Sequence, residues 1–278
     1  CYHFAVGAAI YQPFPMLPGR RAQAWRHQPA FWRPPHFHAE PEMNVVLGGR
    51  CVMRVGRHHY AMSPSSVLLL APGQDHEMVS AEPELRLWVM ALSPELAEVV
   101  VGSVGRSMMG LRQVSSEGLE GMLLELAEVR SKEVVETQVA KLFRQYHEPR
   151  WQHVLSRRAV EVMGTEPGCQ ATSLARQLHT HPSVLSRVFH EEVGSSLTEY
   201  RTRLRLLQFI RNVDEGKNLT EAAFASGFGS YAQLHRAFHR ALGCAPRRFF
   251  DGERERLSAE TVGEPGFASS VSAVVAEP

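Results

Sequence analysis

The chain has 278 residues, of which 44% are hydrophobic and 21% are charged, and its formal net charge is +1. This composition excludes a disordered chain, a low-complexity repeat and a strongly charged tail protein, and the length suits two domains. The four cysteines form no CxxC pair and have no regular spacing, so neither a disulfide framework nor a zinc finger is indicated.

The charge is distributed unevenly along the chain. Residues 1–150 carry 15 Lys or Arg and 15 Asp or Glu, residues 151–252 carry 13 and 9, and residues 253–278 carry 2 and 5, so these parts contribute 0, +4 and −3. A surplus of four charges in a segment of domain length is a weak indication of nucleic-acid binding. No stretch of the sequence qualifies as a membrane-spanning helix or a signal peptide, so we expect a cytoplasmic protein with no membrane partner.

Short strands separated by turn residues are predicted in the first third of the chain. The predicted strands cover residues 44–47, 50–55, 59–62, 67–70 and 85–92, with turn signals at Gly48-Gly49, Gly56 and Pro72-Gly73. Such a series is typical of an antiparallel barrel or sandwich. We therefore expect residues 1–92 to form a domain built on an antiparallel β-barrel.

Helices are predicted after this domain. Ser93-Pro94-Glu95 has the form of a helix start, with Ser at the N-cap and Pro in the first turn. From Leu119 to Tyr146 apolar residues recur at helical spacing. We expect residues 93–151 to be a helical linker whose apolar stripe pairs two chains into a homodimer. Residues 253–278 show no periodicity and are predicted to be a disordered tail.

Residues 152–252 are predicted to form an all-α domain that contains an internal repeat. The run Leu185–Gly194 aligns with Leu234–Gly243 at an offset of 49 residues, and Leu, Arg, Phe, His and Gly match in place. Each unit consists of a short helix, a turn and a second helix. This is the geometry of a helix-turn-helix, whose second helix enters the major groove of DNA.

Helix boundaries in the two units follow from their capping residues. In the first unit we expect Thr172 or Ser173 to cap the first helix and Pro182 to start the second. In the second unit Thr220 and Ser230 are the expected caps, with the first helix ending at Gly227.

The second helix of each unit is predicted to have an apolar and a polar face. Apolar residues at helical spacing point inward, namely Leu185, Val188 and Phe189 in the first unit and Leu234, Phe238 and Leu242 in the second. The opposite faces carry Ser183, Ser186, Arg187 and His190, and Gln233, Arg236, His239 and Arg240. Base edges and phosphates require such hydrogen-bonding and cationic side chains. Either face alone is more simply read as a solvated surface, but two in tandem favour DNA binding.

The distance between the two units fits the repeat of DNA. Residues 196–213 read as one helix, and eighteen residues span roughly 27 Å. Successive major grooves on one face of DNA are about 34 Å apart. We therefore expect one chain to place two reading helices in successive major grooves of double-stranded DNA.

The region from about Gln152 to Phe250 resembles the double helix-turn-helix domain of the AraC/XylS family of transcriptional regulators. Matching positions occur through the whole region: Leu174-Ala175, Ser183, Leu185 to Phe189, Val193-Gly194, Tyr200, Arg205-Leu206, Ala223, Gly227-Phe228, Phe238, Gly243 and Pro246. The resemblance implies that Ser183, Ser186 and Arg187 contact bases, with Ala232, Gln233, His235 and Arg236 in the matching places of the second unit. The chain departs from the family pattern at Ala232-Gln233-Leu234, and at Phe250, where an arginine is common. A regulator of this kind is more often an activator than a repressor, and an activator would have RNA polymerase as a partner.

A histidine cluster occurs in the predicted barrel. His36, His38 and Glu42 share the parity of an extended strand and face one side, and His76 comes from a separate strand. Two or three imidazoles with a carboxylate suit Zn, Fe, Mn or Ni. The spacing resembles the two motifs of the cupin barrel, which many AraC-like regulators carry as a sensory domain.

Three interpretations of this cluster remain open at this point. The residues could hold a divalent metal, line a metal-free pocket for a small-molecule effector, or merely line a polar barrel mouth and bond to the backbone. No cofactor beyond that possible metal is indicated. The favoured function is a sequence-specific DNA-binding regulator, not an enzyme, controlled by an effector in a cupin-like domain. The alternatives are a metal-dependent cupin enzyme that carries a DNA-binding module, and a regulator with no small-molecule ligand.

Overall fold

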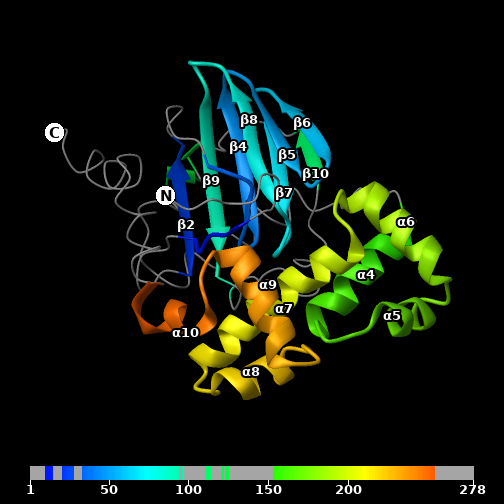
Figure 1. Cartoon of the computed structure of the whole chain (residues 1–278). Coiled ribbons are helices and arrows are strands. Elements are labelled where there is room, and N and C mark those ends of the chain that lie inside the picture. The colour runs from blue at the N-terminus through cyan, green and yellow to red at the C-terminus, as the bar shows by residue number, and fades with distance from the viewer. Residues whose placement is uncertain are drawn as a thin grey trace.

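The computed structural model describes residues 10–14, 21–27, 33–93, 96, 110–113, 120–121, 123–124 and 153–253. Strands occupy the first part of the chain and helices the second, and the two parts pack against each other (Figure 1). The expected α+β architecture, with a β-rich domain followed by a helical one, is confirmed. No helix in these ranges is both long and apolar enough to cross a membrane.

The β-rich domain consists of two sheets. The described strands are β1 (Ile10–Tyr11), β2 (Ala22–Arg26), β3 (His36–Phe37), β4 (Glu42–Gly48), β5 (Cys51–Val55), β6 (His58–Met62), β7 (Ser66–Leu70), β8 (His76–Ala81), β9 (Arg86–Leu92) and β10 (Gly110–Gln113). They form two five-stranded sheets with the orders β1-β3-β8-β5-β6 and β10-β7-β4-β9-β2. Strand β1 pairs with β3 in parallel, whereas the other pairs are antiparallel.

Apolar side chains from both sheets form a shared core. In β5 the alternate residues Cys51, Met53 and Val55 are buried, because successive side chains of a strand point to opposite faces. They join a cluster that also contains Leu68 and Leu70 of β7. The five predicted strand segments coincide with β4, β5, β6, β7 and β9, so alternation and turn residues located most of this domain.

Part of the predicted helical linker proves to be a strand. Residues 110–113 form β10, which pairs antiparallel with β7 at the edge of the second sheet. Its sequence GLRQ contains a single apolar residue and so shows no alternation of apolar and polar side chains, and its pairing with β7 is between segments that are distant in sequence. Residues 96, 120–121 and 123–124 are helical, as expected, and the remainder of 93–151 lies outside the described residues. The same holds for the predicted tail beyond Glu253.

The second domain is entirely helical in the described residues. Its helices are α4 (Val154–Thr165), α5 (Ala171–Gln177), α6 (Pro182–Val193), α7 (Leu197–Asp214), α8 (Leu219–Ala225), α9 (Tyr231–Leu242) and α10 (Pro246–Arg248), followed by the π-helix η2 (Phe249–Glu253). The predicted long helix at 196–213 is α7, with Ser196 as its N-cap. Helices α5 and α6, and then α8 and α9, form the two predicted helix-turn-helix units.

Some of the predicted caps are correct and others are wrong. Pro182 starts α6 and Ser230 caps α9, as expected. In the first unit the N-cap of α5 is Gln170, so Thr172 and Ser173 lie inside the helix. In the second unit the N-cap of α8 is Asn218, whose side chain accepts hydrogen bonds from the N–H groups of Thr220 and Glu221. Asn is as good an N-cap as Ser or Thr, so α8 begins earlier than a cap at Thr220 predicts.

Each helix-turn-helix unit has its own hydrophobic core. Leu185 and Phe189 of α6 pack with Leu174 of α5, and Leu234 and Phe238 of α9 pack with Phe209 of α7. Leu207 of α7 packs against both cores, so this helix joins the units into one body. The second core also contains Phe37 of β3, a residue of the β-rich domain that is 1% exposed.

Candidate functional site

The predicted DNA-reading residues lie on α6 and α9, the second helix of each unit. The His181 side chain accepts a hydrogen bond from the Ser183 N–H at the start of α6, and the Ser230 hydroxyl accepts one from the Gln233 N–H at the start of α9. The predicted apolar stripes are buried on both helices. Because these stripes are fixed against the core, the opposite faces of both helices point to solvent.

The outward residues are free to meet a ligand. Ser183, Ser186, Arg187, His190, Ala232, Gln233, Arg236 and Arg240 are exposed, and His235 is half-buried. The Arg187 side chain is 64% exposed and has only a surface ion pair, at 3.5 Å, with Glu191 one turn along. The Gln233 side-chain oxygen accepts a hydrogen bond of 2.9 Å from the Gly229 N–H. This contact leaves the amide N–H groups of Gln233 as its outward donors.

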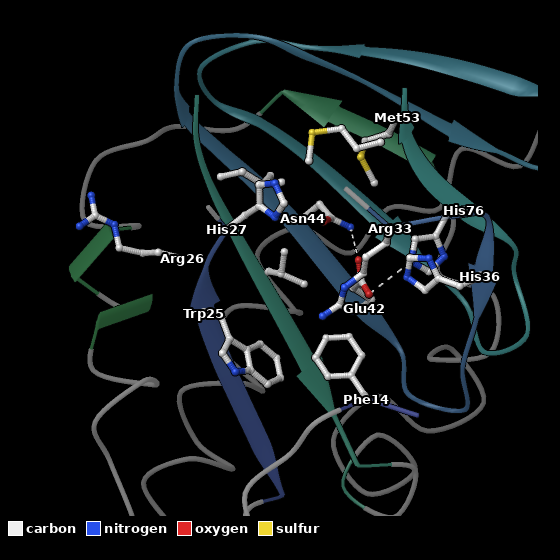
Figure 2. Close-up of a pocket in the computed structure, with 13 residues that line it drawn as sticks. Phe14, Trp25, Arg26, His27, Arg33, His36, Glu42, Asn44, Met53 and His76 are labelled. Atoms are coloured by element: carbon white, nitrogen blue, oxygen red, sulfur yellow. Dashed lines mark hydrogen bonds and ion pairs between the residues drawn. The ribbon is translucent and has the colours of Figure 1, made fainter. Parts of the chain in front are cut away.

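A second candidate site is a cavity inside the β-rich domain. It has a volume of about 80 Å³ and lies next to the predicted histidine cluster (Figure 2). His36, Glu42 and His76 line it, whereas His38 is buried beside it. The remaining lining residues are Phe14, Trp25, Arg26, His27, Arg33, Asn44, Met53, Met78, Leu87 and Val89.

The structure brings together the four predicted residues of the cluster. Strand β3 and the residue after it supply His36 and His38, β4 supplies Glu42 and β8 supplies His76, which pairs with His36 across the sheet. One ring nitrogen from each histidine lies within 4.8 Å of the others, and all three residues are buried. The His38 Nε2 lies 2.9 Å from the Glu42 Oε2, and the His76 Nε2 lies 3.5 Å from the same oxygen.

Backbone carbonyls orient all three imidazoles in the same way. The Nδ1 of His36 lies 2.9 Å from the carbonyl oxygen of Pro34, that of His38 lies 2.9 Å from Glu40, and that of His76 lies 3.1 Å from Gln74. A carbonyl only accepts, so each Nδ1 carries the proton and donates it. The Nε2 atoms of His38 and His76 then face the Glu42 carboxylate. Metal-binding histidines commonly donate their other ring N–H to a backbone carbonyl in the same way.

The charges in this cluster are strongly coupled. Burial alone would raise the pKa of the Glu42 carboxyl, but His76 and His38 hold it well below its usual value. Burial alone would lower the pKa of His76, but Glu42 raises it. Burial, together with the neighbouring His76 and His38, lowers the pKa of His36 well below 6.5. The surroundings therefore favour the ionised form of Glu42 and the protonated form of His76, and they disfavour the protonated form of His36.

Sequence reasoning missed the apolar part of the cavity. Trp25 of β2 and Phe14 stack with ring centroids 4.6 Å apart, and the Phe14 ring is 5.0 Å from that of His38. Figure 2 shows both rings at one end of the cavity and Met53 at another. The strand pattern around Trp25 could have revealed a buried face, but it could not show that this face borders a cavity. The mixture of apolar walls and a few converging polar groups is typical of a small-molecule site.

Two family profiles match the chain. The profile described as an AraC-like ligand binding domain covers residues 17–156, and the profile described as a helix-turn-helix domain covers residues 174–252. The first contains the histidine cluster, and the second contains α6 and α9. A comparison with curated protein sequences finds no significant match.

Solved structures of similar proteins give distant likenesses. ToxT from Vibrio cholerae is 15% identical, with a TM-score of 0.46 over 83% of this chain and 97% of that one. ToxT from Vibrio cholerae strain SCE256, with an unsaturated fatty acid bound, is 14% identical, with a TM-score of 0.45 over 82% and 93% of the two chains. The AraC-like transcriptional activator CuxR is 12% identical, with a TM-score of 0.31 over 68% and 72%.

The ligand-binding profile spans half of the chain, and the helix-turn-helix profile accounts for most of the rest. The order of the two matches agrees with the order of the two domains in the structure. The chain belongs to the AraC family of transcriptional regulators.

Proposed function

We propose that this protein is a sequence-specific DNA-binding regulator, an activator, whose action depends on a small molecule in the cavity of its cupin-like domain. The single observation that supports this proposal best is that two exposed recognition helices, α6 and α9, are joined by the 18-residue helix α7 in the same chain as the cavity. In this proposal the protein works in the cytoplasm as a homodimer and has RNA polymerase as a partner.

The proposed DNA contacts come from both recognition helices. Helix α6 contributes Ser183, Ser186, Arg187 and His190, and α9 contributes Ala232, Gln233, His235, Arg236 and Arg240. The arginines read guanine or hold phosphates, the amide and hydroxyl groups bond to base edges, and the small Ala232 allows close approach. Each chain then covers two successive major grooves.

Selection of genomic fragments by the purified protein tests this function. We expect wild-type protein to enrich a small set of fragments, and footprinting to show two protected grooves per chain about one DNA turn apart. A protein with both Arg187→Ala and Arg236→Ala should enrich none of them. Enrichment that is equal for the two proteins, or absent for the wild type, would exclude the proposed DNA-reading role. The genes beside the enriched fragments would indicate the class of effector.

A specific observation favours a metal-loaded form of the sensor domain. His36, His38 and His76 each donate Nδ1–H to a backbone carbonyl, and one ring nitrogen of each lies within 4.8 Å of the others. The Nε2 atoms of His38 and His76 also lie 2.9 and 3.5 Å from the Glu42 Oε2. The buried His76 Nε2 has no hydrogen-bond partner among the described residues, as expected of a nitrogen that is available to a metal. A divalent transition metal such as Zn²⁺ would bind the deprotonated Nε2 atoms, because metal ligands bind in their deprotonated form.

Metal analysis of the purified protein tests this site. We expect about one divalent metal per chain in the wild type and in His59→Ala, which alters an exposed histidine on β6. His36→Ala and His76→Ala should each lose the metal, because three nitrogen ligands become two. Absence of stoichiometric metal from wild-type protein, even after incubation with Zn²⁺, would leave a metal-free effector pocket as the remaining proposal. It would also exclude a metal-dependent cupin enzyme.

A further inference from the structure

The β-rich domain touches both helix-turn-helix units. Figure 1 shows α7 and α9 directly beneath the ends of the strands. In the first unit, the Tyr200 hydroxyl on α7 donates a hydrogen bond of 3.0 Å to the carbonyl oxygen of Pro72. The loop between β7 and β8 that contains Pro72 therefore rests on α7.

An ion pair and a close backbone contact extend this interface. Arg203 of α7 pairs with Asp75 of the β7–β8 loop, and both side chains are largely buried. The turn between β5 and β6 reaches the end of α6, where a Cβ atom added to Gly56 would lie 2.6 Å from the carbonyl carbon of Gly194. The two backbones are thus in direct contact, with no room for a side chain between them.

An aromatic contact joins the β-rich domain to the second helix-turn-helix unit. Phe37 of β3 belongs to the hydrophobic core that contains Phe209 of α7 and Phe249 of η2. Tyr11 of β1 bridges them, with ring centroids 5.8 Å from Phe37 and 6.4 Å from Phe249. The Arg203 guanidinium carbon also lies 5.7 Å from the centre of the Phe37 ring. One arginine of α7 thereby contacts both of the β-domain groups that dock on the helices.

These two docking groups are direct chain neighbours of the cavity histidines. Phe37 lies between His36 and His38, and Asp75 precedes His76. Because successive side chains of a strand point to opposite faces, His36 faces the cavity while Phe37 faces the helical domain. The Gly73 N–H donates a hydrogen bond of 2.9 Å to the His38 carbonyl oxygen, which ties the loop to the strand.

We propose that Arg203, Phe37 and Asp75 form an interdomain latch that links the occupancy of the histidine-lined cavity to the placement of the two DNA-reading units. This inference rests on the proposed function, because it supplies the regulation of that same site. A ligand or metal that moves His36 or His76 moves Phe37 or Asp75 on the same short backbone. The recognition faces stay exposed in the docked form, so the latch acts on the relative position of α6 and α9 and does not cover them.

Energetic coupling between two sites is reciprocal. A substitution that weakens the interdomain latch must therefore also destabilise the conformation of the residues around the cavity. Arg203→Gln removes the charge from the latch, and Arg203→Lys retains it. Arg211→Gln is the matched control, because Arg211 is an exposed arginine near the end of the same helix. Leu178→Ala, in the core of the first unit, controls for general loss of stability.

The readout is the rate at which diethyl pyrocarbonate modifies His36 and His76 in the full-length chain, measured peptide by peptide with mass spectrometry. His59, which is exposed, is the internal reference. Deuterium uptake of residues 34–40 is measured in parallel. We expect Arg203→Gln to raise modification of both cavity histidines at least threefold, Arg203→Lys to restore most of the protection, and the two controls to match the wild type.

Equal modification in Arg203→Gln and Arg211→Gln would overturn the latch, as would an increase of the same size in Leu178→Ala. The measurement needs neither DNA nor effector, so its outcome is independent of the genomic selection. A chain that enriches DNA but shows no change in cavity protection has the proposed function without the latch. If Arg203→Gln raises the modification of the cavity histidines but the wild-type protein enriches no DNA, the two domains are linked and the proposed function is wrong.

Discussion

Single residues at the two candidate sites differ in how much they contribute to folding. The recognition-helix arginines are exposed, and the Arg187–Glu191 pair on α6 is a surface ion pair of the kind that contributes little to stability. The three histidines and Glu42 of the cluster are buried, and each has a hydrogen-bond partner or an ion pair that its replacement would leave unmatched. Substitution of these exposed arginines is therefore expected to change binding with little effect on stability, whereas substitution in the cluster changes stability as well.

We expect Arg187→Ala and Arg236→Ala each to weaken binding to a selected DNA fragment by about 1–3 kcal/mol, because each removes a bidentate donor from a recognition helix. For both variants, the midpoint of thermal unfolding should stay within about two degrees of the wild-type value. Fluorescence anisotropy titrations at fixed salt measure the affinity. Arg158→Ala on α4, which removes an exposed arginine outside both units, is the control and should bind normally. Unchanged affinity of both variants would refute the assignment of the recognition helices.

His27, beside the cavity, should make the stability of the protein depend on pH. Burial and the nearby Arg33 lower its pKa from 6.5 to about 4. Between these two pH values the unfolded chain binds a proton that the folded chain does not, so stability falls as the pH falls, by up to about 3 kcal/mol. Urea unfolding at pH 6.5, 5.5 and 4.5 measures the effect. His27→Gln should show a smaller loss over this range, and identical slopes for the two proteins would contradict the expectation.

Helix ends position the elements that carry the candidate DNA contacts. Helix α7 has a capping box, in which the Ser196 hydroxyl accepts from the Glu199 N–H and the Glu199 carboxylate accepts from the Ser196 N–H. Helices α6 and α9 both end at a glycine with a positive φ, Gly194 at 82° and Gly243 at 73°. These local signals explain why the repeated unit could be located from sequence, since each depends on residues close together in the chain.

Loss of the α9 cap should destabilise the second recognition helix. Ser230→Ala removes the hydroxyl that accepts from the Gln233 N–H and should lower the free energy of unfolding by about 1 kcal/mol. Ser230→Asn keeps a capping side chain and should cost much less. Chemical denaturation followed by circular dichroism distinguishes them, and equal losses for the two variants would show that the cap contributes nothing.

Which parts of the fold and of the site could be predicted depends on how far apart in the sequence the interacting residues lie. Strands β4, β5, β6, β7 and β9 and helices α5 to α9 were predictable, because hydrophobic period and capping are local. The cluster of His36, His38, Glu42 and His76 was predictable from motif spacing. Strand parity was the wrong reason for Glu42, because residues 38–41 are not strand and Glu42 begins β4 in the other sheet. The cavity wall of Phe14 and Trp25 was not predictable, because sheet pairing brings together residues that are distant in sequence. The docking role of Phe37 escaped for the same reason, since a lone aromatic residue between two histidines has no periodic pattern.

On the scale of the whole molecule, the two domains share part of one hydrophobic core. Phe37 of the β-rich domain is 1% exposed within the core of the second helix-turn-helix unit. Tyr200 of the first unit is 1% exposed and bonds to Pro72 of the β-rich domain. Removing either domain would therefore expose apolar surface of the other. We expect the intact chain to unfold in a single calorimetric transition.

Phe37→Ala should separate that transition into two. The substitution removes a buried ring at a cost of about 3–5 kcal/mol, and the loss falls on the contact between the domains. Leu68→Ala, in the core between the two sheets, should cost a similar amount yet leave one transition. Differential scanning calorimetry on the wild type, Phe37→Ala and Leu68→Ala measures the number of transitions and the loss of stability. A single transition in Phe37→Ala would mean that the domains are coupled through other contacts.

The contact between Gly56 and Gly194 restricts which sequences this arrangement can tolerate. Both glycines have a positive φ, 58° and 82°, so a turn and a helix end already favour glycine there. Asparagine adopts such angles readily and commonly replaces glycine in turns. At position 56, however, the Cβ atom of asparagine would collide with the backbone of Gly194 in the helical domain of the same chain. In a family alignment, homologues with this interdomain contact should therefore have glycine at both positions. Homologues without the contact should also accept asparagine at position 56.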